Sequence, residues 1–267
     1  MKIHFIAGLT RSGSTLLAGI LKQNPAFLAG PTSPVLRIFQ SVEHGTSQEN
    51  NFACSINDAQ KLALRMSVFT SMYPPDGRVV FDKHHFWTGK MSILTTLFPE
   101  AVVICCVRNL SWVMDSWERV YQSNPFEMSS FFNFKADTTV YTRCAKHGAS
   151  DGAVGRIFDA LKEAYYGPWN DRLHLVEYTQ LATQPAATMR QLYQRIGEPF
   201  FQHDFSNVEM SFDQFDRQMG MPGLHTVGRA VKFVPRDTIL PPDLFDRYRD
   251  DCFWSSHHHR NPLREVA

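Results

Sequence analysis

Residues 8–17 read GLTRSGSTLL and directly follow the apolar run IHFIA at 3–7. Gly8 and Gly13 allow backbone angles that a side chain would forbid. Ser14 can begin a helix, and the free amides and dipole of a helix start favour an anion. The stretch therefore predicts a strand, an anion-binding loop and a helix in that order, although a turn without a ligand is the alternative for this loop taken alone.

The loop departs from the usual triphosphate cradle, in which GxxxxGK is followed by Ser or Thr. Ser14 stands where that lysine would be, and the nearest cation is Arg11. A guanidinium presents a fork of donors that suits phosphate or sulfate oxygens. We therefore expect an anion held without the lysine and hydroxyl pair that accompanies magnesium and a triphosphate.

Four runs rich in apolar and β-branched residues predict strands that are covered on both faces. Helix-like segments alternate with them, which favours an α/β fold with a central parallel sheet flanked by helices, and extra helices towards the C-terminus. The whole chain, 1–267, is expected to form one domain. The strand runs are KIHFIA at 2–7, RVVFD at 78–82, AVVICCV at 101–107 and LHLVEY at 173–178, and the helix-like segments are 14–23, 57–72, 111–121, 153–166 and 184–196.

A second anion site is expected after the strand at 101–107. Arg108 ends that strand and Ser116 follows eight residues later. If Ser111 caps the next helix, Ser116 lies little more than one turn inside it, so both polar groups can reach one phosphate. Ligands of parallel sheets sit at the carboxyl ends of the strands, which would place this site beside the first. An ordinary salt-bridge role for Arg108 is the alternative.

Composition narrows the class of protein. A net charge of +1 with 27 cationic residues spread along the chain argues against a nucleic-acid or membrane surface. No apolar run approaches the ~20 residues of a membrane span, and no signal peptide is apparent. The cysteine count of five is odd, and two of them are adjacent in a strand run, so structural thiols in a reducing compartment are expected. We expect a cytoplasmic location.

Together these motifs resemble the sulfotransferases that use 3′-phosphoadenosine-5′-phosphosulfate (PAPS). TRSGSTLL at 10–17 is similar to that family's 5′-phosphosulfate loop, usually PKSGTTW or PRSGTTL. VICCVRNLSWVMDSW at 103–117 is similar to its 3′-phosphate segment, in which an arginine and a serine eight apart bind the ribose 3′-phosphate. The resemblance implies PAPS as donor and adenosine 3′,5′-bisphosphate (PAP) as product, bound by Arg11, Ser12, Gly13, Ser14, Thr15, Arg108 and Ser116.

Two further stretches extend the resemblance to about residue 245. LHLVEYTQLATQP at 173–185 is similar to the family's Tyr-Glu-x-Leu segment and implies that Tyr178 lies near the adenine, although Thr179 replaces the usual acidic residue. GLHTVGRAVKFVPRDTILPPDLF at 223–245 resembles bacterial and tyrosylprotein-type members, in which a basic loop closes over the nucleotide's phosphates. Arg229 and Lys232 are the candidates there.

The stretch FDKHHFW at 81–87 resembles the Lys-x-His of cytosolic sulfotransferases. The resemblance implies that His85 takes the acceptor's proton and Lys83 stabilises the bridging oxygen, with Arg11 as the third catalytic residue. His84 is the alternative base, because side chains alternate in an extended segment and only one of the two would face inward.

The catalytic glutamate of tyrosylprotein sulfotransferases has no counterpart, because Pro31 and Thr32 stand in its place. This absence favours the histidine mechanism. Should both histidines prove dispensable, Asp82 or Glu118 would be the next candidates for the base.

The acceptor carries a hydroxyl, and a phenol, sugar, lipid, natural product or tyrosyl peptide all stay open. Aromatic residues near the predicted site could wall an acceptor pocket or belong to the core. They are Phe86, Trp87, Trp112, Trp117, Tyr121, Phe126, Phe131, Phe132 and Phe134.

No metal is expected, because the chemistry needs none and His257–His259 read as a solvated tail. A homodimer is not excluded. A P-loop kinase or hydrolase, or a non-catalytic nucleotide-binding module, are the competing functions.

Overall fold

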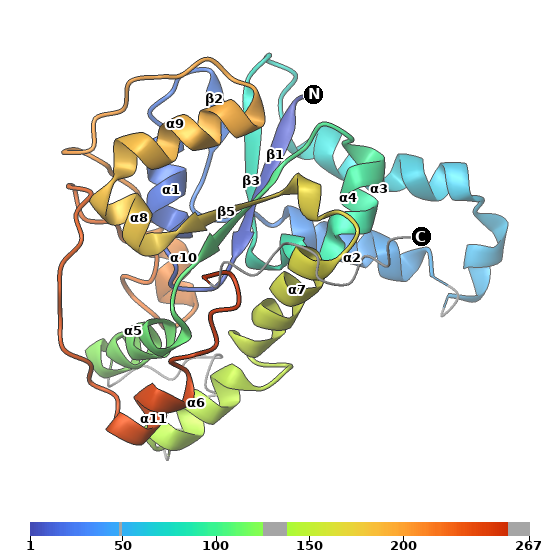
Figure 1. The fold of residues 1–267 in the computed structure, drawn as a ribbon. Coiled ribbons are helices and arrows are strands. Elements are labelled where there is room, and N and C mark those ends of the chain that lie inside the picture. The colour runs from blue at the N-terminus through green and yellow to red at the C-terminus, as the bar shows by residue number, and fades with distance from the viewer. Residues whose placement is uncertain (48–49, 125–137, 256–267) are drawn as a thin grey trace, which may run out of the picture.

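The computed structural model describes residues 1–47, 50–124 and 138–255. Its centre is a five-stranded sheet in the order β2-β3-β1-β4-β5, in which every neighbouring pair is parallel (Figure 1). The strands are β1 (Ile3–Gly8), β2 (Phe27–Ala29), β3 (Val79–Lys83), β4 (Val103–Val107) and β5 (Leu173–Glu177). The α/β fold and the four expected strands are confirmed, and the short β2 was not foreseen.

Five helices correspond to the expected segments: α1 (Ser14–Leu21), α3 (Asp58–Met72), α5 (Leu110–Ser123), α7 (Gly155–Tyr166) and α9 (Pro185–Ile196). Six more were not foreseen: α2 (Val35–Gly45), α4 (Met91–Leu97), α6 (Val140–Gly148), α8 (Tyr178–Thr183), α10 (Asp213–Gln218) and α11 (Pro242–Arg247). Most of these span fewer than three turns, which is too short for a clear apolar period. The extra C-terminal helices are therefore α10 and α11.

The cap of α5 differs from the expectation. Asn109, not Ser111, is the N-cap, because its side chain accepts a hydrogen bond from the Ser111 amide at 3.0 Å. The Ser111 hydroxyl instead donates to the Phe245 carbonyl at 2.5 Å and ties the start of α5 to α11. Ser116 consequently lies in the second turn of the helix.

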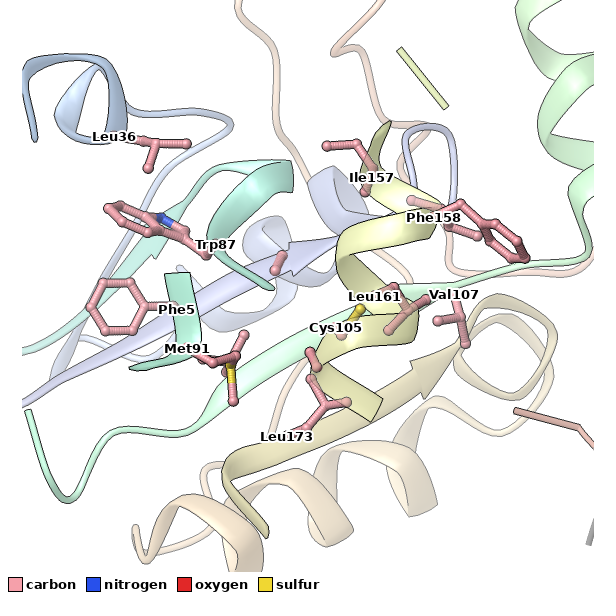
Figure 2. Close-up of a cluster of buried hydrophobic side chains, with 14 of the residues drawn as sticks. Phe5, Leu36, Trp87, Met91, Cys105, Val107, Ile157, Phe158, Leu161 and Leu173 are labelled. Atoms are coloured by element: carbon pink, nitrogen blue, oxygen red, sulfur yellow. The ribbon is translucent and has the colours of Figure 1, made fainter. Parts of the chain in front are cut away.

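Two apolar clusters cover the two faces of the sheet, as strands buried on both faces require. Successive residues of β1 point to opposite clusters, since Phe5 belongs to one and Ile6 to the other. The first cluster joins the sheet to α2, α4 and α7, and Figure 2 shows Phe5 and Trp87 meeting in it. The second joins the sheet to α1 and α9. The arrangement is a sheet between two helical layers.

The cysteines behave as the sequence suggested. All five are free thiols. Cys105 and Cys106 are fully buried in β4, each in a different apolar cluster. Burial raises the pKa of the Cys106 thiol to about 12, so it stays protonated and packs as a small apolar group.

Gly8 ends β1 at a very close approach to β4. Its φ is +105°, and a Cβ built on it would lie 2.1 Å from the carbonyl oxygen of Cys106. Both strands are fully buried there, so neither backbone can move aside. No residue other than glycine fits this position, and the loop at 9–13 starts from it.

We expect Gly8→Ala to lower the free energy of unfolding by at least about 3 kcal/mol, because left-handed strain and backbone overlap add together. Gly197→Ala is the matched control, since Gly197 also has positive φ (+68°) but no atom within 4 Å of the added Cβ. It should cost only about 1 kcal/mol. Urea denaturation of both variants measures the difference, and equal losses would show that the contact with Cys106 is unimportant.

Candidate functional site

The carboxyl ends of all five strands border one cleft of about 890 Å³. The loop after β1 contributes Thr10 to Thr15 apart from Ser12, and the segment after β2 contributes Thr32 and Ser33. His84 and His85 follow β3, Arg108 follows β4, and Tyr178 follows β5. Residues between 212 and 236, between 151 and 157, and Arg37 of α2 line other parts of the wall. The motifs that lie far apart in the sequence therefore meet at one place, as expected for a parallel sheet.

The loop after β1 presents a helix start to this cleft. Arg11 and Gly13 both have positive φ, +60° and +90°, and Gly13 is the N-cap of α1. No side chain caps α1, so its first amides and dipole are directed at the cleft that Gly13, Ser14 and Thr15 line. The loop has the local structure of an anion site.

Ser12 has a different place from its neighbours. Its hydroxyl is 1% exposed and donates to the Leu9 and Cys106 carbonyls, the latter at 2.9 Å. It does not line the cleft. The Ser12 side chain braces the loop against β4, so only its backbone could serve a ligand.

Arg11 joins the two sequence motifs directly. Its Nε donates to Ser116 Oγ at 3.1 Å and its Nη1 donates to the Leu224 carbonyl. The Arg108 guanidinium lies 4.3 Å over the Tyr178 ring. Arg11, Arg108, Ser116 and Tyr178 therefore surround one region of the cleft.

The cations in this region repel one another. Burial and, after it, the charges of Arg108 and Arg236 lower the pKa of Arg11 to about 10. Burial also lowers the pKa of Arg108, with Arg236 adding to the effect. An anion bound among the three guanidinium groups would remove this repulsion, so the cluster favours a multiply charged ligand.

Arg236 was missed by the sequence, which pointed to Arg229 and Lys232 in the same segment. Lys232 and Arg236 line the cleft, and Arg236 is held by Asp115 at 2.8 Å. The Arg229 side chain is 82% exposed, faces Glu209 at 3.6 Å and does not line the cleft. Because the segment from 221 to 240 has no helix or strand, no periodicity could have shown which of its cations faces inward.

Lys83 is buried immediately behind the loop. The residue is 2% exposed and does not line the cleft, and its ammonium donates to Thr15 Oγ1 at 3.2 Å and to the Pro31 carbonyl. Burial lowers the pKa of Lys83 to about 8. The Pro31 carbonyl oxygen therefore helps to hold this lysine in place.

His84 and His85 both line the cleft, so the expectation that only one faces inward is wrong. The strand ends at Lys83 and a 3-10 helix, His85–Lys90, begins two residues later, so the alternation of an extended chain no longer applies. Their hydrogen bonds differ. His85 Nδ1 lies 2.8 Å from the Gly8 carbonyl, whereas His84 Nδ1 accepts from the Phe86 amide at 3.2 Å.

These contacts fix opposite tautomers. A carbonyl oxygen can only accept, so His85 carries its hydrogen on Nδ1 and the lone pair on Nε2. Neutral His84 carries its hydrogen on Nε2. Burial lowers the pKa of His84 to about 4 and that of His85 well below 6.5, so both rings are neutral near pH 7. His85 can accept a proton in the cleft, and His84 can only donate a hydrogen bond there.

An Asp–His pair also borders the cleft and was not foreseen. Asp216, fully buried, accepts from the His225 amide at 2.7 Å and faces His225 Nδ1 at 2.6 Å. His225 lines the cleft. Burial lowers the pKa of His225, which the Asp216 hydrogen bond partly offsets. Nothing in the sequence marks the pair, because the two residues are nine apart across an irregular segment.

The alternative carboxylates, Asp82 and Glu118, are turned away from the cleft. Asp82 accepts from Ser33, Tyr73 and the Trp87 indole, and burial raises its pKa. Glu118 is bound by both ends of the Arg143 guanidinium, at 2.6 and 2.9 Å. Neither lines the cleft, so neither is placed to receive a proton from a ligand.

Of the five expected aromatic residues that the structure describes, Trp87 and Trp117 belong to the buried core. Trp117 lines the cleft, and its indole donates to Thr10 Oγ1 at 2.9 Å. Trp87 is fully buried, and Trp112 packs edge-on against Phe245. Tyr121 lies under Arg143 and Phe86 under Arg156. Phe126, Phe131, Phe132, Phe134 and His257–His259 lie outside the described residues.

Two features are absent from the described residues. Within 1–47, 50–124 and 138–255, no three His, Cys, Asp or Glu side chains gather as they would around a metal ion. In the same part of the chain, no helix has both the length and the apolar character needed to cross a membrane.

The chain is similar to known sulfotransferases in sequence and in fold. The family model described as "Sulfotransferase family" matches residues 4–202. The sulfotransferase domain from the curacin biosynthetic pathway is similar, with a TM-score of 0.54 and 17% identity over 93% of this chain and 90% of that one. A sulfotransferase from Alicyclobacillus acidocaldarius has a TM-score of 0.52 and 15% identity over 82% and 89%. At these identities the two structures show a shared fold. No curated protein sequence matches the chain.

Proposed function

Since the chain belongs to the sulfotransferase family, we propose that it transfers a sulfuryl group from PAPS to an acceptor hydroxyl, with His85 as the base. The observation that carries the proposal is the hydrogen bond from Arg11 to Ser116, because it joins the phosphosulfate loop to the 3′-phosphate segment in one cleft. We expect the protein to be cytoplasmic and its chain to act as a single domain.

The donor fits the cations of the cleft. PAPS carries a 5′-phosphosulfate and a ribose 3′-phosphate, and the cleft offers the α1 helix start with Arg11, and Arg108 with Ser116. The Tyr178 ring under the Arg108 guanidinium gives the adenine a flat partner. Lys232 and Arg236, rather than Arg229, are the cations of the C-terminal segment that face these groups.

The reaction resembles phosphoryl transfer, in which in-line positioning and electrostatics dominate. The acceptor oxygen forms a bond to sulfur while its proton passes to His85 Nε2. The bond from sulfur to the bridging oxygen breaks, and the electron pair leaves with the 5′-phosphate of PAP. The Gly8 carbonyl keeps the His85 hydrogen on Nδ1 and so keeps Nε2 ready to accept.

Lys83 supports the leaving group. Its ammonium lies against Thr15, the second residue of α1, where the loop would hold the phosphosulfate. Negative charge builds on the bridging oxygen only as the bond breaks, so a buried cation there favours the transition state over the ground state. Arg11 would share this role through its place in the same loop.

The competing functions have less support. A kinase or nucleotide hydrolase would need the lysine that Ser14 replaces, together with a carboxylate placed for magnesium. A non-catalytic nucleotide module would account for Arg11, Arg108 and Ser116 but not for a buried lysine and a base with a free Nε2 beside them.

Nucleotide preference tests the donor. PAP should raise the melting temperature far more than AMP, because AMP lacks the 3′-phosphate that Arg108 and Ser116 are placed to bind. Arg108→Ala should lose about 2 kcal/mol of PAP binding, the scale of a charge-assisted hydrogen bond. Arg190→Ala is the control, since Arg190 is exposed on α9 against Phe200 and outside the cleft. Equal affinity for PAP and AMP would contradict the assignment.

The base is tested by two neighbouring variants. His85→Ala should lower kcat by roughly 10²–10⁴-fold, the range of general-base catalysis, while PAP affinity stays nearly unchanged. His84→Ala should leave kcat close to that of the native protein, because its Nε2 already carries a hydrogen. The assay measures PAP release with phenols, glycosides and tyrosyl peptides as acceptors. Full activity in both variants and in the double variant would disprove the histidine mechanism.

The pH profile of kcat/KM tests both groups together, because it reports the free enzyme. His85 must be neutral, and its pKa lies well below 6.5, so the acid limb should fall below pH 6.5. Lys83 must be protonated, and its pKa is about 8, so the rate should fall as the pH rises through about 8. Lys83→Ala should lower kcat and abolish the basic limb, and a limb unchanged in that variant would assign it to another group.

A further inference from the structure

The cleft has a second cationic region, away from Arg11 and Arg108. Arg37 of α2 and Arg156 of α7 both line the cleft, and so does His84. The Arg156 guanidinium lies 4.0 Å over the Phe86 ring, which limits its freedom. These three residues come from three segments that the sequence did not connect.

The two arginines have no counter-charge of their own. Both side chains are exposed, and neither makes an ion pair with a carboxylate in the described residues. Arg11 and Arg108 likewise make no such ion pair there, whereas Arg236 pairs with Asp115. Asp151 is the one acidic residue among the described residues that line the cleft, and it also makes no ion pair. This part of the wall therefore has a surplus of positive charge.

The region is separate from the donor site. Arg37 and Arg156 lie on α2 and α7, which pack against one face of the sheet, whereas Arg11 and Arg108 lie in the segments that follow β1 and β4. The two groups of cations thus have different neighbours. A donor bound at Arg11 and Arg108 would leave Arg37 and Arg156 without a partner.

Arg37 and Arg156 do not stabilise the helices that carry them. Each lies in the first turn, Arg37 in α2 and Arg156 in α7, and neither helix has an acidic residue in that turn. A cation near a helix N-terminus is opposed by the dipole. Their placement is therefore better explained by a ligand than by helix stability.

We propose that Arg37, Arg156 and the Nε2 hydrogen of His84 bind an oxyanion, a carboxylate or a phosphate, that is part of the acceptor. This inference rests on the proposed function and adds its substrate class: hydroxylated acids rather than neutral phenols, sterols or sugars. Because His84 adjoins His85, the anionic group is held near the hydroxyl that His85 deprotonates. Arginine suits this task, since its donors match the two oxygens of such a group.

Matched acceptors test the inference. Each acid is compared with its uncharged, fully esterified methyl ester, by PAP release and by calorimetry on the PAP-loaded protein. The acids are 4-hydroxyphenylacetate, 3-hydroxyoctanoate and 4-hydroxybenzylphosphonate. At least one acid should bind about tenfold or more tightly than its ester, the scale of one charge-assisted contact. The carboxylate and phosphonate arms show which oxyanion the site prefers.

Arginine variants test whether the preference for acids over esters arises at this region. Arg37→Ala and Arg156→Ala should each raise KM and Kd for the acid about tenfold, leave the ester unchanged and leave PAP affinity unchanged. Arg37→Lys should recover part of the loss. Arg190→Ala, another exposed arginine stacked on a phenylalanine but outside the cleft, should change nothing.

The outcomes separate the two proposals. If no acid binds more tightly than its ester, or if the arginine variants affect acid and ester equally, the anion subsite is wrong, and transfer to neutral acceptors would leave the sulfotransferase mechanism intact. If the acids bind in an Arg37-dependent way but no acceptor is sulfated, the subsite stands and the proposed reaction fails.

Discussion

The close approach of β1 and β4 at Gly8 determines the geometry of the whole site. Here the Cys106 carbonyl accepts hydrogen bonds from the Leu9 amide and the Ser12 hydroxyl, both at 2.9 Å. The same glycine's carbonyl accepts from His85 Nδ1. This peptide unit therefore sets where the loop at 9–13 begins and which nitrogen of His85 is left free. A side chain at Gly8 would disturb binding and chemistry together, because both start from the same peptide unit.

The second constraint is electrostatic. The fold brings Arg11, Arg108 and Arg236 to one end of the sheet and buries Lys83 behind them, which lowers the pKa values of Arg11 and Lys83. The protein supplies part of the compensation itself. Asp115, fully buried, binds Arg119 and Arg236 and accepts from the Ile239 amide, so it holds the C-terminal segment against α5. The remaining positive charge faces the cleft, where a ligand with several negative charges gains the most.

The sequence could predict the sheet because its strands are continuous apolar runs, and those runs follow from burial on both faces. It could not predict β2, since three residues, FLA, carry no period. The motif residues Arg11, Arg108, Ser116, His84 and His85 do line one cleft, because parallel strands place their carboxyl ends together. The sequence could not point to Arg236 or to the Asp216–His225 pair. Arg236 and His225 lie in a segment without helix or strand, and Asp216 lies in the short helix before it, so only tertiary contacts decide which of these side chains face inward.

The two adjacent histidines show why position in a motif does not by itself assign chemistry. His84 and His85 are the same residue type and both line the cleft, and burial lowers the pKa of both. What separates them is the partner of Nδ1: a carbonyl oxygen for His85 and an amide for His84. The first partner leaves a lone pair on Nε2 and the second leaves a hydrogen, so one ring can take a proton and the other can hold an anion. Both partners are backbone groups, so the division of roles depends on where β1 ends and where the 3-10 helix begins.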